Sequence, residues 1–526
     1  MDSSKLKVIL VIVFAAFAAL YLGVAAATAQ MEAIAWVAGA VIVAFVLALG
    51  KHVWVLIPIT LALAGTINAI PGSPAPWWAA TMTVFAMFLM RFLSRVRDTF
   101  VFRFTWLDFA ILLQVLAVSQ AFIRNPAGLS IFGGDVVGGK PYIAFGMSFA
   151  AYFLLSIVPT ELKLVKSTVI LIIFMAICDG GLMITTTLFP AVGAATIPIY
   201  SGADFNASTD QSTNIDLSEI RLMPALILGK ALGLAAFTLF RPISTLNPLK
   251  PISFLMMTSS LGLILLSGFR SALGMLAIYA VVSSLVRNRT SDVVIAGFLG
   301  MVALSLLIVT GSARHLPFGA QRILSILPIE VEDRAREDAT NSSEWRFEMW
   351  KLALTTDRYI QNKWLGDGFS FRSDELAMMR DVASNTQRTT GGLNDQDLMM
   401  AKGSYHGFHV EAIRMTGALG LLCALISMGI FFRYAWKQIQ YFRGRPEWGF
   451  VLFLCIPYLI TPFYVMLVFG AYRNGLPLIL VGAGMIKLLD NIRVRELAAA
   501  QLEAQNTETE TSQMSRLSPG RSPHTA

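Results

Sequence analysis

Cysteine and charge are both scarce in this chain of 526 residues. Only 14% of the residues are charged, whereas an average soluble domain contains about 25%. The three cysteines, Cys178, Cys423 and Cys455, all lie inside apolar stretches and form no CxxC pattern. The low charge excludes an ordinary soluble domain, and the cysteine pattern excludes a disulfide framework and a cysteine-bound metal site.

Several catalytic motifs are missing as well. The chain has no GxSxG nucleophile motif and no HExxH zinc motif. A GxxxxGK spacing runs from Gly134 to Lys140, but Pro141 replaces the Ser or Thr with which a phosphate-binding loop holds magnesium, so we interpret it as a chance match. Asp395-Gln396-Asp397 is interpreted as a solvated acidic turn. The sequence therefore indicates neither a metal nor another cofactor, and we expect none.

Apolar residues, in contrast, make up 56% of the chain, and its mean hydropathy is +0.64. Long apolar stretches recur from end to end, and a helix needs about 20 such residues to cross a bilayer. We therefore expect an all-α polytopic membrane protein with about 12–14 transmembrane helices and one large, mainly helical outer loop. The candidate spans are residues 8–28, 32–50, 53–70, 76–92, 105–123, 141–158, 167–189, 222–240, 251–268, 271–286, 293–311, 413–432, 449–469 and 474–489.

The first candidate span also has features of a signal peptide. Lys5 and Lys7 precede it, and Ala27-Thr28-Ala29 resembles a small-residue cleavage site. Its apolar run of about 20 residues is longer than the roughly 7–15 of a signal-peptide core. We therefore expect a retained helix.

The distribution of Lys and Arg predicts the orientation in the membrane. One set of short connections is rich in basic residues, whereas the opposite set contains few, and basic residues favour the cytoplasmic side. We therefore expect both termini in the cytoplasm and residues 312–412 outside. The basic residues of the opposite short connections are Arg124, Lys140, Arg221, Arg270 and Arg473.

Composition divides the chain into four parts. Residues 1–311 are expected to form about eleven transmembrane helices and residues 413–490 about three more. Residues 312–412 form the outer loop subdomain, and residues 491–526 form a polar cytoplasmic tail. A loop of this length without structure of its own is uncommon, so we expect helices within it.

A helix is predicted in the middle of the outer loop. Ser342-Ser343-Glu344 is typical of a helix N-cap, and Trp345, Met349, Leu352 and Ile360 follow at approximately helical spacing. Further along the loop, Gly366-Asp367-Gly368 is expected to break the helix, and residues 382–404 are expected to form a flexible segment or lid.

Charged residues at the outer face and within spans require an explanation. Arginines at the outer ends of helices either reach to lipid phosphates or, as a set, form an anion site, since guanidinium groups bind phosphate oxygens bidentately. Asp179 and Lys230 lie inside predicted spans. They either pair with each other or contribute to a proton or ion path, and the sequence leaves both open.

Two of the five histidines lie three residues apart where the outer loop ends, at His406 and His409. Such a pair can bind a metal, but no third ligand accompanies it. Either histidine can instead be structural, whereas an imidazole opposite a set of arginines suits proton transfer at neutral pH. We interpret His406 as a general base.

Three stretches, taken together, resemble one family. The first is Ser267-Gly268-Phe269-Arg270-Ser271-Ala272, and the second is Arg346 with Trp350 followed by Gly366-Asp367-Gly368. The third is His406 followed by Gly417-Ala418-Leu419-Gly420-Leu421. In their order, their spacing and the membrane face on which they are predicted to lie, these stretches resemble the O-antigen ligase and O-antigen polymerase superfamily. Its members are polytopic membrane proteins that transfer lipid-linked glycans.

The resemblance covers residues 267–421 and has two departures. Gly407 stands where the family has an Asn after the histidine, and Val410 stands where it has a Leu. The remaining spans match only in topology. A shift of register would place His409 rather than His406 in the family's position.

The resemblance implies a glycosyltransferase at the outer face of the bacterial inner (plasma) membrane. Its donor would be a glycan linked to undecaprenyl pyrophosphate, its acceptor a hydroxyl of a glycan or of lipid A-core, and the transfer would require no metal. Membrane lipid would be a further partner, and nucleic acid would not. The loop would then be periplasmic.

The resemblance also suggests roles for individual residues. His406 would deprotonate the acceptor hydroxyl, and Arg270 would be the first pyrophosphate ligand. Tyr405, His409 and Glu411 would orient the histidine or the acceptor. The other arginines considered for pyrophosphate binding are Arg221, Arg346, Arg414, Arg124 and Arg473.

Two other functions remain open at this point. A repeat-unit polymerase for O-antigen or exopolysaccharide, within the same superfamily, would differ from a ligase only in its acceptor. A lipid-linked glycan flippase or other transporter would need cationic residues through the membrane rather than at one face. The clustering of arginines at one face favours a transferase.

Overall fold

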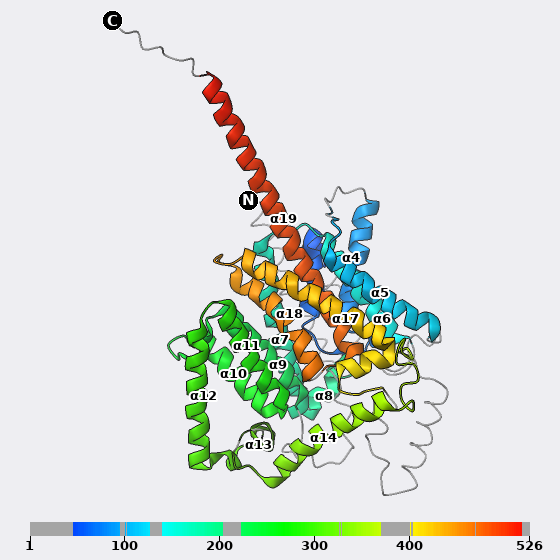
Figure 1. The fold of residues 1–526 in the computed structure, drawn as a ribbon, viewed down its shortest axis with the longest axis vertical. Coiled ribbons are helices and arrows are strands. Elements are labelled where there is room, and N and C mark those ends of the chain that lie inside the picture. The colour runs from blue at the N-terminus through cyan, green and yellow to red at the C-terminus, as the bar shows by residue number, and fades with distance from the viewer. Residues whose placement is uncertain are drawn as a thin grey trace, which may run out of the picture. The chain divides into compact units, whose positions relative to one another are not determined.

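The computed structural model describes residues 46–94, 100, 102–126, 139–202, 222–325, 327, 329–369, 400, 403–468 and 470–517. The chain forms two compact units, Met1–Val55 and Leu56–Ala526. In the first unit the described part includes the 3₁₀ helix η1 (Gly50–Val55). The predicted spans 8–28 and, for the most part, 32–50 lie outside the described residues. All further description concerns the second unit (Figure 1).

The second unit is built almost entirely of helices. Its only described strands, β1 (Thr66–Ile67) and β2 (Tyr200–Ser201), form one short antiparallel pair. The helices are α3 (Leu56–Thr60), α4 (Pro76–Leu93), α5 (Trp106–Arg124), α6 (Lys140–Ile157), α7 (Leu162–Leu188), α8 (Pro190–Thr196), α9 (Met223–Leu239), η3 (Pro242–Leu246), α10 (Pro251–Ser267), α11 (Arg270–Val286), α12 (Thr290–Thr310), η4 (Ser312–His315), α13 (Phe318–Leu324), α14 (Asp333–Thr355), α17 (Phe408–Tyr441), α18 (Trp448–Leu467) and α19 (Tyr472–Leu517).

Eight of the described helices are long and apolar enough to cross a membrane. The apolar helices α9, α10 and α11 have 17 residues each, which is at the lower limit of about 17–25 residues for a span. The fold is therefore that of an all-α polytopic membrane protein, as the hydropathy predicts.

Proline and glycine set many of the helix ends. Pro76 and Pro251 are the first residues of their helices, where a proline loses no hydrogen bond. Gly268 and Gly311 follow α10 and α12 with left-handed φ angles of 71° and 60°, a conformation that favours glycine. These local signals explain why the predicted spans agree with the helices at these ends.

The predicted span 53–70 is wrong in its second half, because the helix ends at Thr60. β1 follows and pairs with β2, with Gly65 in close contact with Tyr200. The carboxylate of Asp179 accepts hydrogen bonds from the Tyr200 hydroxyl at 2.5 Å and from the Ala64 amide at 3.1 Å. Asp179 therefore holds this short connection, and of the two readings left open for Asp179 and Lys230, the pair is not formed.

Several polar side chains inside the bundle form hydrogen bonds with neighbouring helices. Gln114 on α5 donates to the Ser427 hydroxyl on α17 at 2.9 Å, and Ser427 donates to the Ala110 carbonyl at 3.0 Å. Such pairing is required where water is absent. It fixes α5 against the middle of α17, whose N-terminal part belongs to the candidate site.

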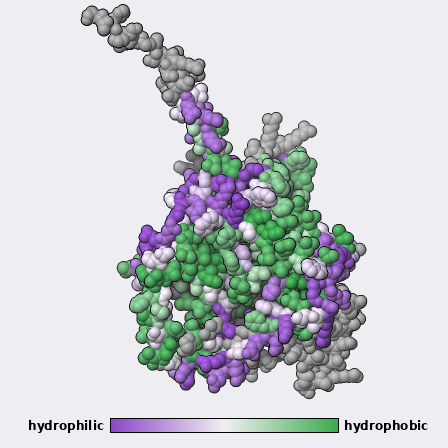
Figure 2. All heavy atoms as spheres, in the orientation of Figure 1, coloured by the Kyte–Doolittle hydropathy of each residue, from purple (hydrophilic) through white to green (hydrophobic). Residues whose placement is uncertain are grey.

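The two ends of the bundle differ in their contacts. We call one of them the loop end, and the other the tail end. At the tail end, Lys487 donates to Asp108 at 2.5 Å and to Thr105 at 2.7 Å, and Arg103 pairs with Asp490. On the face in Figure 2, hydrophobic residues gather over the middle of the helices and hydrophilic ones gather at both ends. The loop end is where α5, α10 and α18 finish and where α6, α11, α17 and α19 begin.

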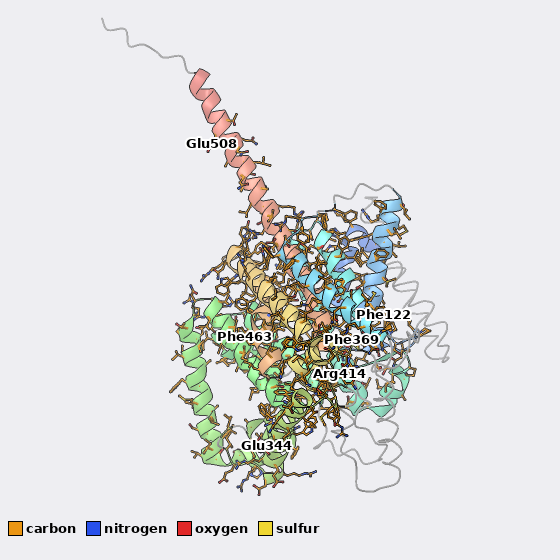
Figure 3. The ribbon with its side chains drawn as sticks, turned by 45° about the vertical axis from the view of Figure 1, so that its right-hand side comes forward. Phe122, Glu344, Phe369, Arg414, Phe463 and Glu508 are labelled. Carbon is orange, nitrogen blue, oxygen red and sulfur yellow. The ribbon has the colours of Figure 1, made fainter. Side chains whose placement is uncertain are left out.

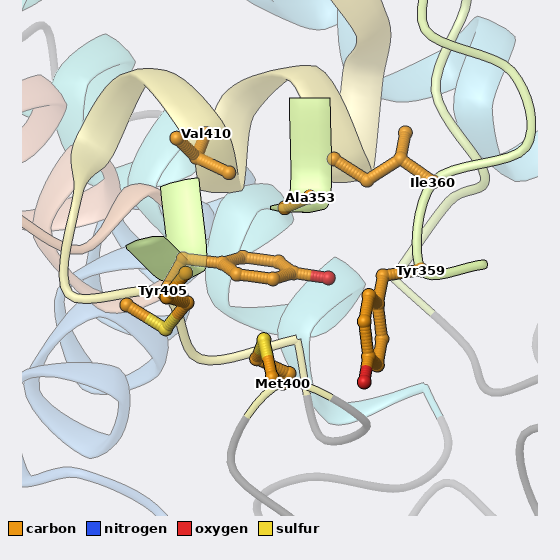
Figure 4. Packing of buried hydrophobic residues seen from close by; sticks show 7 residues of the cluster. Ala353, Tyr359, Ile360, Met400, Tyr405 and Val410 are labelled. Carbon is orange, nitrogen blue, oxygen red and sulfur yellow. The ribbon is translucent and has the colours of Figure 1, made fainter. Parts of the chain in front are cut away.

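The described part of residues 312–412 is helical, as predicted, but the cap at Ser342 is wrong. α14 begins at Asp333 and passes through residues 342–344 without interruption. Ile360 lies after the helix, in a buried cluster with Met349, Tyr359 and Tyr405 (Figure 4). Just before α14, Glu332 and Gln321 exchange hydrogen bonds at 2.9 and 3.1 Å, a contact that an N-cap pattern does not reveal. Most of the predicted lid, residues 382–404, lies outside the described residues.

Candidate functional site

A break in α17 organises the loop end. Gly417 has φ 77° and ψ 178°, which no helix adopts. The amide groups after it donate to another segment: Ala418 to the carbonyl of Lys363 at 2.8 Å, and Leu419 to that of Trp364 at 3.2 Å. A Cβ at Gly366 would lie 2.5 Å from the Gly417 nitrogen. The glycines of two sequence motifs are thus in direct contact.

Asp367 closes the turn that carries these glycines. Its carboxylate accepts hydrogen bonds from the amides of Gln361 and Asn362, both at 2.9 Å. Its own amide donates to the Arg414 carbonyl at 2.7 Å, and that of Gly368 donates to the Met415 carbonyl at 3.0 Å. The Asp367 carboxylate therefore holds its own loop together by binding two of its backbone amides.

Two of the predicted pyrophosphate ligands hold the same turn. Arg414 is 4% exposed and donates to the Gly368 carbonyl at 3.1 Å, with the Asp367 carboxylate 4.0 Å away. Arg124, at the end of α5, donates to the Gly366 carbonyl at 3.0 Å. Figure 3 labels Arg414 beside Phe369 of this loop. Both arginines thus have a structural function here, and their predicted role as ligands stays a prediction.

His406 lies at the start of α17 in an unusual backbone conformation. Its φ is 50°, which is uncommon for a residue with a side chain and concentrates at functional sites. Its ring meets that of Trp345 edge to face, with centroids 6.1 Å apart, and Trp350 donates to the Tyr405 carbonyl at 2.8 Å. A Cβ at Gly407 would lie 2.8 Å from the Trp350 indole. This contact leaves no room for a larger residue at position 407.

Two of the predicted supporting residues have structural contacts. Glu411 is buried, and its carboxylate accepts a hydrogen bond from the Tyr472 amide at 2.7 Å, with further contacts to the backbone of Tyr405 and Arg473. The ring of His409 lies 4.7 Å from that of Trp350. Glu411 thus connects the segment before His406 to the start of α19. Arg473, the second residue of α19, interacts electrostatically with the Glu411 carboxylate.

Another group surrounds Tyr464, near the end of α18. Its hydroxyl lies close to the side chain of Ser271, the second residue of α11, and interacts electrostatically with Arg346 of α14. Arg270, the first residue of α11, precedes Ser271. The Lys230 ammonium on α9 lies 5.5 Å from the centre of the Tyr464 ring. The structure thus brings Arg346 to the helix end that carries Arg270.

Sequence reasoning did not include Tyr464 or Lys230 in the site. A tyrosine in an apolar span gives no signal of its own, whereas Lys230 was visible as a basic residue inside a span. Arg221 lies outside the described residues. Within the ranges that the structure describes, no group of three His, Cys, Asp or Glu side chains is placed to hold a metal ion.

Neither a scan against protein-family models nor a search of curated proteins finds a match to this chain. The fold defines it as a polytopic α-helical membrane protein. The loop end, where the three sequence motifs meet, is its candidate functional site.

Proposed function

We propose that the protein is an inner-membrane glycan transferase of the O-antigen ligase type. It moves a glycan from an undecaprenyl-pyrophosphate donor to an acceptor hydroxyl at the periplasmic face. Both termini are then cytoplasmic, and residues 312–412 face the periplasm. The reaction uses no nucleotide and no metal, because the donor already carries the activated bond.

The observation that carries the proposal is the meeting of the three motifs in space. Gly366 is in contact with Gly417, Trp350 holds the backbone beside His406, and Arg346 lies near the start of α11, where Arg270 is found. The motifs come from α11, from the segment 346–368 and from α17. A chance resemblance would not require these positions to meet at one end of a bundle.

The chemistry follows from these groups. As the bond from the anomeric carbon to the donor phosphate breaks, negative charge grows on the leaving lipid pyrophosphate, and Arg270 and Arg346 stabilise it. The acceptor oxygen bonds to the anomeric carbon and loses its proton to His406. Trp345, Trp350 and Glu411 hold His406 in place. The products are the glycosylated acceptor and undecaprenyl pyrophosphate.

The proposal is tested by glycan transfer with the purified full-length protein in detergent. The assay contains undecaprenyl-pyrophosphate glycan and a mixture of acceptors, and it compares wild type with His406→Ala. Loss of a general base lowers the rate by about 10²–10⁴-fold. His315→Ala is the matched control, because His315 is exposed on η4, and we expect it to retain full activity.

Each result of this assay has a clear meaning. The acceptor that is consumed distinguishes a ligase, which uses lipid A-core, from a polymerase, which uses a repeat unit. Full activity in His406→Ala would refute the assignment of the base and direct attention to His409. Absence of product with every acceptor, together with donor movement across liposomes, would identify a flippase instead.

A further inference from the structure

Lys230 is a cation inside the bundle that lacks a counter-charge. It lies about two turns into α9, is partly buried, and contacts the face of the Tyr464 ring. No carboxylate of the described residues forms an ion pair with Lys230. Asp179, the other charged residue considered within a span, is bonded to Tyr200 and Ala64 instead. A charged group in a membrane-spanning helix is costly and usually has a function.

The other interior lysine shows what a purely structural lysine looks like in this chain. Lys487 on α19 is 1% exposed and donates to the Asp108 carboxylate, to the Thr105 hydroxyl and to the Arg103 carbonyl. Every hydrogen of its ammonium thus has an acceptor. Lys230 has none of these hydrogen-bond partners. Its helix α9 packs against both α11 and α18, which also pack against each other.

The ring beside Lys230 belongs to Tyr464, which itself lies near a hydroxyl and a second cation. Tyr464 connects Lys230 to Ser271 and to Arg346, so that two cationic side chains act on the same phenol. An anionic ligand between α9, α11 and α18 would supply both a counter-charge and hydrogen-bond acceptors to Lys230.

We propose that Lys230 binds the diphosphate of the lipid-linked donor, at a subsite formed with Tyr464 and Ser271. This inference rests on the proposed function and extends it. Arg270 and Arg346 lie at the rim of the loop end, whereas Lys230 projects from deeper in the bundle. Lys230 therefore contacts the phosphate that carries the lipid, and the arginines contact the one that carries the glycan.

The experiment measures binding of undecaprenyl diphosphate by the full-length protein in detergent, without any acceptor. Lys230→Met is expected to weaken binding by about ten- to hundredfold, as for loss of a charged hydrogen-bond donor, whereas Lys230→Arg retains most of it. Lys166→Met is the matched control, because Lys166 on α7 also lies over a ring, that of Phe450 at 5.6 Å. Undecaprenyl monophosphate and inorganic pyrophosphate show whether the lipid or the diphosphate is recognised.

Thermal unfolding of the same variants separates binding from packing. Removing an uncompensated charge leaves the ligand-free protein at least as stable, so Lys230→Met is expected to unfold at or above the wild-type temperature while it binds the diphosphate lipid less well. If Lys230→Met bound like wild type, or lost stability without the ligand, the inference would be wrong. Weakened binding without transfer to any acceptor would retain this site and refute the proposed reaction.

Discussion

At the scale of single residues, Gly417 determines how the loop end is built. Its left-handed φ of 77° lets α17 break and accept the segment Lys363–Gly368. A Cβ at this position would overlap the Trp364 carbonyl. No other residue type meets both requirements, so the glycine is a structural necessity.

Gly417→Ala is therefore expected to destabilise the protein. The strained backbone alone costs about 1–3 kcal/mol, and the overlap with Trp364 adds to this. The measurement is the unfolding midpoint in detergent, together with transfer activity, which falls with it.

Gly429→Ala is the matched control for Gly417→Ala. Gly429 lies on the same helix with open space where a Cβ would be, so alanine should raise helix stability by up to about 1 kcal/mol. Equal effects of the two substitutions would contradict the role of the break in α17.

At the scale of elements, α14 is the support for His406. Trp345 and Trp350 lie on α14, one against the His406 ring and the other bonded to the Tyr405 carbonyl. The helix thereby fixes a backbone that has φ 50° at its central residue. Residues from an earlier part of the same outer loop become part of the site through this helix.

Trp350→Phe tests this support, since it keeps an aromatic ring and removes only the indole donor. We expect kcat to fall by about ten- to hundredfold through misplacement of His406, with little change in KM. The control is Trp364→Phe, whose side chain is 78% exposed. A change in KM alone would show that Trp350 contributes to substrate binding instead.

The elements also show what could be predicted from the sequence. Helix ends at Pro76, Pro251 and Gly268 were predictable because proline and glycine act locally. The start of α14 at Asp333 was not, since Glu332, just before it, is held by hydrogen bonds with Gln321 of α13 that only the tertiary structure shows. The pairing of Tyr464 with Ser271 and Lys230 was also hidden, because it depends on which faces of α9, α11 and α18 meet.

At the scale of the whole molecule, the orientation in the membrane can be tested directly. Glu344 on α14 and Glu508 on α19 lie at opposite ends of the second unit (Figure 3) and are both exposed. In a cysteine-free background, an impermeant maleimide is expected to label Glu344→Cys in intact spheroplasts and Glu508→Cys only after lysis. The reverse pattern would place the candidate site in the cytoplasm and refute the proposed reaction.

One helix of the bundle depends on its surroundings more than the others do. α12 has a single buried residue, Asp292, which accepts hydrogen bonds from Arg241 at 2.6 and 2.9 Å. Side chains such as Phe298 and Val309 are 61% and 84% exposed. With few buried residues and one ionic attachment at its first turn, we expect α12 to adapt its tilt to the thickness of the surrounding hydrocarbon. The host lipid thus completes this part of the architecture, and a change of membrane would move α12 before it moved the rest.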